Sequence, residues 1–107
     1  GKSLDTHTTM GPWIVTRDEL PDAPELDIRC WINGEKRQDS NTRYMIFGVA
    51  EVISELSQGM TLKAGTIIAM GTPAGVGMGF DPPKWLHPGD EVACSIEGIG
   101  TLTNTVR

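Results

Sequence analysis

One strict alternation of apolar and polar residues stands out in the first half of the chain. Its apolar side comprises Leu26, Ile28, Cys30 and Ile32, and the other side comprises Asp27, Arg29 and Trp31. Residues two apart share a face of a β-strand, so the pattern predicts a half-buried strand. Asn33-Gly34 follows and favours a type I′ turn, because both central residues of that turn have positive φ. We therefore expect a hairpin whose second strand runs from about Glu35 to Asp39.

A spacing of three and four residues marks the apolar positions in the middle of the chain. The series comprises Met45, Ile46, Val49, Val52, Ile53 and Leu56. This period predicts one amphipathic helix, from about Met45 to Gln58, with Glu51 and Glu55 on its polar side. Ser40-Asn41-Thr42 supplies residues that start helices, and Gly59 supplies a stop. We expect the helix to pack by its apolar side.

Shorter apolar runs predict the remaining strands. They are Trp13-Ile14-Val15, Thr66 to Met70, Glu91 to Ile96 and Thr101 to Val106, with turns at His87-Pro88-Gly89-Asp90 and at Gly98 to Gly100. The rest of residues 1–25 is polar and interrupted by prolines, which predicts loops. Roughly five or six strands and one helix predict a mainly β fold. At 107 residues, the chain has the size of a single domain, which we place at residues 1–107.

A glycine-rich run at residues 71–79 follows the predicted buried strand at 66–70. Glycines in that position indicate backbone that turns sharply or approaches another group closely. A loop of this kind on a rigid strand is a common place for a ligand, and a mobile connection is the alternative. Nucleotide motifs do not fit, because Phe80 stands where Gly-x-Gly-x-x-Gly needs its third glycine and no Gly-Lys supplies a Walker A loop.

Composition narrows the classes of partner. The net charge of −5 argues against nucleic acid or an anionic membrane, since both need a basic face. No apolar run is long enough to span a bilayer. The two cysteines, Cys30 and Cys94, lie in apolar alternating runs that are typical of buried thiols. This usage fits a reducing cytoplasm, and it leaves a single disulfide open.

Few side chains suggest chemistry. Lys2 can fix a carboxylate or an enolate as a point charge, although a terminal lysine is commonly only solvated. Thr72, in the turn Gly71-Thr72-Pro73, can present a hydroxyl and a backbone N–H to a carboxylate, or it can satisfy its own turn. His7 and His87 lack the spacing of metal ligands, and the residues form no complete acid–base or metal constellation.

Seven short motifs occur in order along the chain. They are Lys2-Ser3-Leu4-Asp5-Thr6, Gly11-Pro12-Trp13-Ile14-Val15, Ile32-Asn33-Gly34-Glu35 with Arg37-Gln38, Met45-Ile46-Phe47, Gly71-Thr72-Pro73-Ala74-Gly75-Val76-Gly77, Leu86-His87-Pro88-Gly89-Asp90 and Ile96-Glu97-Gly98-Ile99-Gly100. Together they resemble the C-terminal half of the fumarylacetoacetate hydrolase family. The resemblance covers essentially the whole chain, and the combination is specific although each motif alone is not.

The resemblance implies a mixed β-sandwich roll that uses Mg²⁺ or Mn²⁺ and acts on β-diketo or 2-oxo acids. Hydrolysis, decarboxylation and keto–enol isomerisation in this family share an enolate held between the metal and a lysine. By position, Lys2 matches the active-site lysine, Gly71 and Thr72 match the loop that contacts the substrate's carboxylate end, and Thr6 matches a residue near the metal in some members.

The chain also departs from the family pattern. The family's Glu-x-Glu pair, a later Asp and its His/Glu catalytic pair precede the lysine and are absent here. The resemblance therefore predicts the C-terminal part of a larger catalytic domain, inactive alone, from a cytoplasmic homodimeric enzyme of aromatic catabolism. Two alternatives stay open: a self-contained, non-catalytic module that binds small anions, and a fragment that folds only by pairing with other chains.

Overall fold

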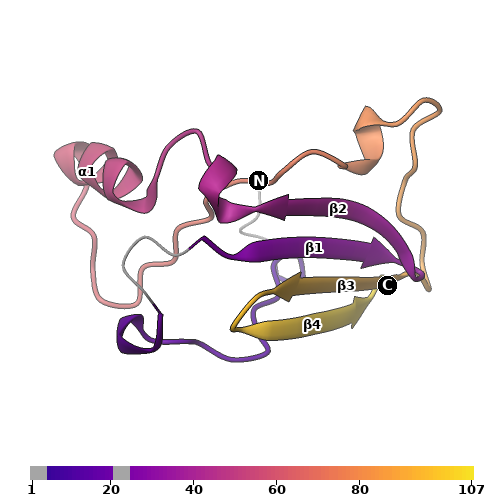
Figure 1. Cartoon of the computed structure of the whole chain (residues 1–107), viewed down its shortest axis with the longest axis horizontal. Coiled ribbons are helices and arrows are strands. Elements are labelled where there is room, and N and C mark those ends of the chain that lie inside the picture. Colours follow the sequence, from indigo (N-terminus) through magenta and orange to yellow (C-terminus); the bar gives the residue numbers. More distant parts are fainter. Residues whose placement is uncertain (1–4, 21–24) are drawn as a thin grey trace.

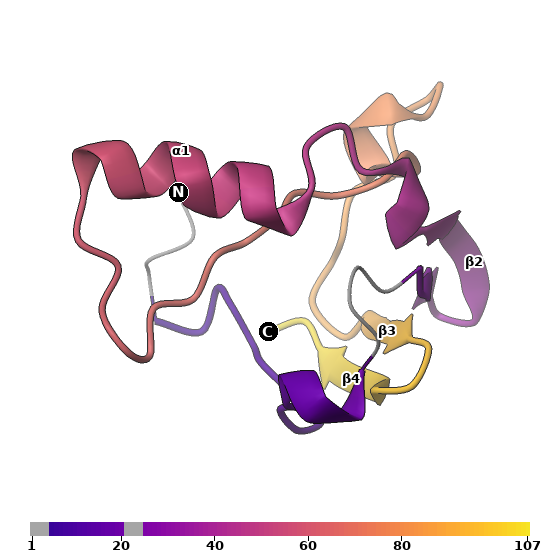
Figure 2. The same cartoon turned by 60° about the vertical axis from the view of Figure 1, so that its left-hand side comes forward.

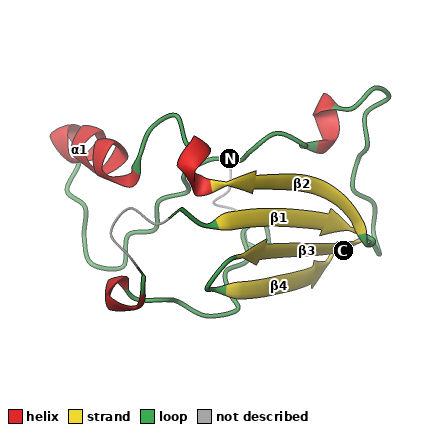
Figure 3. Cartoon of the chain, in the orientation of Figure 1, coloured by secondary structure: helices red, strands yellow, loops and turns green. Residues whose placement is uncertain are grey.

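A four-stranded antiparallel sheet forms the centre of the computed structural model, which describes residues 5–20 and 25–107. Its strands are β1 (Asp27–Ile32), β2 (Glu35–Asn41), β3 (Glu91–Ile96) and β4 (Gly100–Thr105), and they lie side by side in the order β2-β1-β3-β4 (Figure 1). One α-helix, α1 (Val49–Gly59), and short 3₁₀ turns complete the described elements (Figure 3). The predicted mainly β fold with one helix is confirmed.

The β1–β2 hairpin forms as predicted. Both turn residues have positive φ, 50° for Asn33 and 79° for Gly34. Asn33 also ties the turn to the start of β3: its Nδ2 donates to Asp90 Oδ1 at 2.8 Å, and its Oδ1 accepts from the Glu91 N–H at 2.8 Å. The side chain that favours the turn therefore also fixes its place in the sheet.

The register places one row of side chains across all four strands. Gln38, Cys30, Cys94 and Leu102 stand directly opposite one another in that order. Residues that oppose each other on neighbouring strands point to the same face, so this row marks the apolar face of the sheet. Cys30 and Ile32 are its buried apolar residues, each 9% exposed.

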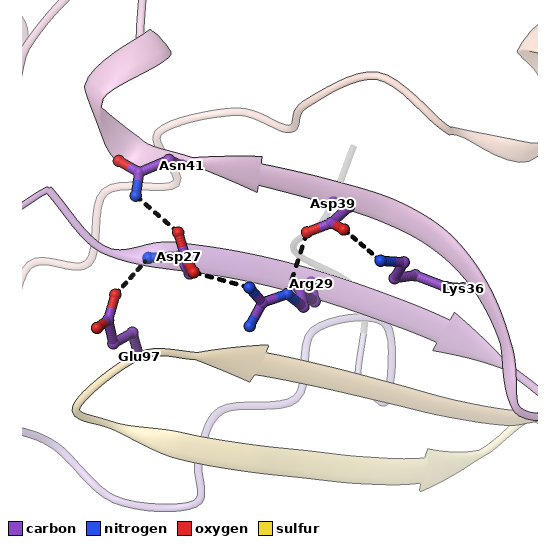
Figure 4. Close-up of polar contacts among 6 residues, drawn as sticks. All are labelled: Asp27, Arg29, Lys36, Asp39, Asn41 and Glu97. Carbon is purple, nitrogen blue, oxygen red and sulfur yellow. Dashed lines mark hydrogen bonds and ion pairs between the residues drawn. The ribbon is translucent and has the colours of Figure 1, made fainter.

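The opposite face carries a polar network on β1 and β2 (Figure 4). Asp27 accepts hydrogen bonds from the buried Asn41 Nδ2 at 2.9 Å and from Arg29 Nη2 at 2.7 Å. Arg29 Nε donates to Asp39 Oδ1 at 3.0 Å, and Lys36 pairs with the same carboxylate. The Asn41 hydrogen bond, helped by Arg29, holds the pKa of Asp27 below its ordinary value. These bonds fix the register of the hairpin from the polar face of the sheet.

A β-bulge interrupts β2. Cys30 pairs with Gln38 and Trp31 pairs with Lys36, so Arg37 is the extra residue. A bulge bends its strand and redirects the side chains around it. Arg37 and Gln38 both line the groove described below.

Two predicted strands are not formed. Residues 13–15 and 66–70 pair with no strand in the described chain. An apolar run becomes a strand only through a ladder of hydrogen bonds, and without one Ile14 is 88% and Ile67 67% exposed. Trp13 instead lies against the β3–β4 turn, where a Cβ on Gly100 would be 3.4 Å from its ring. The described residues hold four strands, so the expected five or six is wrong.

The helix begins later than the apolar spacing predicts. Asn41 does not start α1; its side chain accepts from the Arg43 N–H at 3.0 Å and caps the 3₁₀ turn Thr42–Tyr44. The helix begins at Val49, and the Glu51 carboxylate accepts a hydrogen bond from the N–H of Gly48, the residue before the helix, at 2.9 Å. The local hydrogen bond of Asn41 therefore starts a short 3₁₀ turn instead of the α-helix.

The packing expected for the helix is also not formed. Figures 1 and 2 show α1 beside one end of the sheet rather than over a face. None of its residues is buried, and Val49 and Ile53 on its apolar side are 52% and 43% exposed. The apolar side thus lacks a partner among residues 5–20 and 25–107. Within those ranges, no helix combines the length and the apolar character needed to cross a bilayer.

Candidate functional site

The glycine-rich segment lies beside β2, at the upper right of Figure 1. A Cβ on Gly75 would lie 1.9 Å from the Arg37 carbonyl oxygen, and a Cβ on Gly77 would lie 2.1 Å from the Lys84 carbonyl oxygen. Neither position can hold a side chain without a shift of the backbone. Gly71 and Gly75 also have φ of 101° and 104°. The predicted sharp turning and close approach are confirmed.

An open groove separates this segment from the apolar face of the sheet. The sheet contributes Cys30, Ile32 and Val92, and the bulge contributes Arg37 and Gln38. The other wall consists of residues 75–78 and 84–86. The groove therefore combines an apolar floor with two polar side chains at the β2 edge.

The charged side chains that line this groove, Arg37 and Lys84, are both cations. Arg37, with a side chain only 14% exposed, has its Nε 3.0 Å from Glu35 Oε2, and Lys84 Nζ donates to Glu35 Oε1 at 2.5 Å. Both cations also face the ring of Phe80, at 5.3 and 4.8 Å from its centroid. The Lys84 hydrogen bond, with Arg37, lowers the pKa of Glu35. Arg37 also helps to lower the pKa of Asp90, but neither Glu35 nor Asp90 lines the groove. The cations Arg37 and Lys84 do line it, which favours an anionic ligand.

Thr72 is held by a side chain from the sheet. Gln38 Nε2 donates to Thr72 Oγ1 at 2.9 Å and to the Pro73 carbonyl oxygen at 2.9 Å. Within its own turn, the Thr72 hydroxyl has only a longer contact, 3.4 Å, to the same carbonyl. Thr72 therefore has both a bond from the sheet and a longer bond within its own turn, and the two alternatives for its role stay open. Sequence reasoning missed Gln38 as a site residue, and its one signal was its place in the Asn33-Gly34 motif.

The predicted site residues near the N-terminus are described only in part. Lys2 lies outside the described residues. Thr6 is exposed, with φ of 68°, in a turn where His7 Nδ1 lies 3.1 Å from the Asp5 carbonyl oxygen. The structure does not join Thr6 to Gly71 or Thr72 by a hydrogen bond.

The segment that follows Thr6 nevertheless lies on the same face of the sheet as Thr72. Asn104 Nδ2 donates to Thr9 Oγ1 at 3.1 Å, and a Cβ on Gly11 would be 3.2 Å from Leu102 Cδ1. Leu102 belongs to the same cross-strand row as Gln38, which binds Thr72. The N-terminal segment and the glycine-rich segment thus reach one face from its β4 and β2 edges.

The described residues do not form a metal centre. Within residues 5–20 and 25–107, no three His, Cys, Asp or Glu side chains gather closely enough to hold an ion. Mg²⁺ takes an octahedral set of oxygen ligands, which the hydroxyl of Thr6 cannot supply alone. The assignment of Thr6 as a residue near the metal stays a prediction.

Cys30 and Cys94 are free thiols whose sulfur atoms lie 3.7 Å apart. Ladder bonds from Asn33 to Glu91 and from Glu97 to Asp27 fix the alternation, so the two cysteines form a non-hydrogen-bonded pair. Burial and the neighbouring Cys94 raise the pKa of the Cys30 thiol to about 11. Cys30 is buried as predicted, whereas Cys94 is exposed, because its part of the apolar face is left open.

Comparison with known families identifies this arrangement. The family model described as fumarylacetoacetate (FAA) hydrolase C-terminal matches residues 1–107. The chain belongs to the fumarylacetoacetate hydrolase family. The family resemblance inferred from the seven motifs is thereby confirmed.

Relatives within the fumarylacetoacetate hydrolase family include enzymes with different reactions. The chain is 49% identical over 106 residues to the oxaloacetate tautomerase YisK of Bacillus subtilis, covering 99% of this chain and 35% of that protein. A fumarylacetoacetate hydrolase from Exiguobacterium antarcticum has a TM-score of 0.93 at 48% identity, covering 100% of this chain and 38% of the other. The maleylpyruvate hydrolase from Sphingobium sp. SYK-6, in complex with manganese(II) and pyruvate, has a TM-score of 0.79 at 38% identity, covering 90% and 34%. The chain thus spans little more than a third of these relatives.

Proposed function

We propose that this chain is the C-terminal part of a divalent-metal-dependent enzyme that acts on 2-oxo or β-diketo acids through an enolate. The proposal covers hydrolysis, decarboxylation and keto–enol isomerisation as possible outcomes for one site. Lys2 and the turn Gly71-Thr72 are the proposed contacts to the substrate, with Thr6 near the metal. Mg²⁺ or Mn²⁺ would act as a Lewis acid and would be held by ligands outside the described residues. We place the full-length protein in the cytoplasm as a homodimer.

One observation carries this proposal: the hydroxyl of Thr72 is held by Gln38 beside a groove whose charged lining residues, Arg37 and Lys84, are both cations. A hydroxyl and a cationic surrounding are suited to a small carboxylate. The segment that leads back to Lys2 reaches the same face of the sheet through Gly11. This placement favours a shared ligand for the two ends of the proposed site.

The test uses the full-length protein that contains residues 1–107. We expect turnover of oxaloacetate or maleylpyruvate that EDTA abolishes and that Mg²⁺ or Mn²⁺ restores. Lys2→Ala should lose most of the turnover, because a point charge facing an enolate disappears. Lys63→Ala is the matched control, since Lys63 is an exposed lysine in the turn after α1. Absorbance of the enol and chromatography of the products separate isomerisation from bond cleavage.

Full turnover in EDTA, or an unaffected Lys2→Ala, would contradict the enzymatic proposal. Metal-independent binding of oxalate without any turnover, lost in Thr72→Val, would favour a non-catalytic module for small anions. Residues 1–107 alone should show little or no turnover, so activity of the isolated chain would also count against the proposal.

A further inference from the structure

We propose that Gln38 is a positioning residue that orients the hydroxyl of Thr72 as a hydrogen-bond donor to the carboxylate of the ligand. This inference rests on the proposed function and adds a residue that neither the motifs nor the comparisons assign. It follows from which atoms of Gln38 and of the turn face each other. The ligand class is a small 2-oxo carboxylate.

The orientation of the Gln38 amide is decided by its partners. Its nitrogen lies 2.9 Å from the Pro73 carbonyl oxygen and 3.4 Å from the Ala74 carbonyl oxygen. Carbonyl oxygens only accept, so the NH₂ group and not the amide oxygen must face the turn. The NH₂ group has two protons, and the second one points to Thr72 Oγ1 at 2.9 Å. Gln38 therefore donates to Thr72.

The role of the Thr72 hydroxyl follows from this donation. A hydroxyl has one proton and two acceptor positions, and the Gln38 bond occupies an acceptor position. The proton of Thr72 is left for another acceptor, and within its own turn only the longer contact of 3.4 Å to Pro73 is offered. Thr72 is also exposed beside the groove. A ligand carboxylate that enters there meets a hydroxyl already committed to donating.

The β-bulge gives Gln38 this position. Arg37 is the extra residue of the bulge, and Gln38 opposes Cys30 on the apolar face. Bulges redirect side chains and are common next to active sites. The carbonyl oxygen of Arg37 also lies where a Cβ on Gly75 would be, so the segment 71–75 must pass directly over the bulge. The same backbone feature thus aims the amide and receives the loop.

Introducing a negative charge at Gln38 separates orientation of the hydroxyl from simple support of the loop. Gln38→Glu keeps the shape, but a carboxylate at this position accepts the Thr72 proton and repels the ligand. Gln38→Leu removes the bond and leaves the hydroxyl free to rotate. We expect oxalate, used as the probe, to bind the full-length protein about ten- to hundred-fold more weakly in Gln38→Glu and less than ten-fold more weakly in Gln38→Leu. Gln58→Glu, the same change on exposed α1, is the control.

A double-mutant cycle decides whether Gln38 acts through Thr72. In the Thr72→Val background, Gln38→Glu should cost clearly less than in the wild type, because the hydroxyl that it redirects is gone and only the repulsion between the two carboxylates remains. Equal losses with and without Thr72, or equal effects of Gln38→Glu and Gln38→Leu, would overturn the inference. For any enzyme activity, the effect should appear in KM more than in kcat. If the wild type binds oxalate with this coupling but turns over no 2-oxo acid, the proposed enzymatic function fails and the inference stands. If it turns over 2-oxo acids but binds no oxalate, the inference fails and the proposed function stands.

Discussion

The close approach of Gly75 to β2 predicts a large loss of stability when Gly75 is replaced by alanine. Alanine at Gly75 meets two separate penalties, since its φ is 104° and its Cβ would lie 1.9 Å from the Arg37 carbonyl oxygen. The chain holds glycines that separate these penalties. Gly71 has φ of 101° with no atom within 4 Å, whereas Gly77 has a Cβ position 2.1 Å from a backbone oxygen without a positive φ. Gly79, with its nearest atom at 3.9 Å, has neither penalty.

The expected losses follow from these geometries. A positive φ costs a residue with a Cβ about 1–2 kcal/mol, which is the expected effect of Gly71→Ala. In Gly75→Ala the loop must also move about 1.5 Å to reach an ordinary contact of about 3.4 Å. That shift breaks the two short bonds from Gln38, worth about 1–3 kcal/mol together. Gly75→Ala should therefore lose about 2–5 kcal/mol.

Urea unfolding followed by tryptophan fluorescence measures the four free energies of unfolding. We expect Gly75→Ala to be the least stable variant, Gly71→Ala and Gly77→Ala to be intermediate at about 1–2 kcal/mol, and Gly79→Ala to be near the wild type. If Gly75→Ala were no worse than Gly71→Ala, the loop would not rest on the bulge. The reasoning about the site would then lose its structural basis.

Three further predictions concern the sheet. Asn33→Ala should lose about 1–3 kcal/mol in urea unfolding for its two bonds to the β3 start and more for its φ of 50°, whereas Asn33→Gly should recover the φ part; equal losses would contradict this. Because the folded chain lowers the pKa of Asp27 below 3.8, its contribution to stability is present above that value and is lost as the pH falls through the lowered pKa. Asn41→Ala should flatten the acid-side loss, and an unchanged slope in a pH series of unfolding would refute the link. Hydrogen peroxide should form a disulfide between Cys30 and Cys94 of one chain, because their sulfurs lie 3.7 Å apart. Each reaction converts two thiols and one peroxide into one disulfide and two waters. Intact mass should show the loss of two hydrogens, and the Cys94→Ser variant should not lose them.

Elements whose cause is local could be predicted from the sequence. Asn33-Gly34 predicts its turn type by itself, and the alternation at 26–32 predicts both the strand and the face of the strand on which Cys30 lies. The strand at Glu91–Ile96 was predicted with the bounds that the structure has. In each case the residues that cause the element are the residues that form it.

Elements that need a distant partner were mispredicted. Residues 66–70 have the apolar composition of a strand, but composition does not supply the neighbouring ladder, and Ile67 stays exposed. The apolar side of α1 indicates that the helix can pack against another element, but none of its residues is buried among the described residues. Asn41 was interpreted as a helix start because its side chain caps, and it does cap, although it caps a different element.

The site lies between these two cases. Glycine-rich sequence after residue 70 indicated a close approach, and Gly75 makes one, but only the structure shows that the approach is to the carbonyl oxygen of Arg37. A one-residue bulge changes which face every later side chain on β2 points to, so no periodic pattern could have placed Gln38 beneath Thr72. Gly75 without a Cβ, the extra residue Arg37 and the amide of Gln38 are separate features of the sequence, and the fold brings them together beside Thr72. A substitution at any one of these residues should therefore change the position or the hydrogen bonding of the Thr72 hydroxyl.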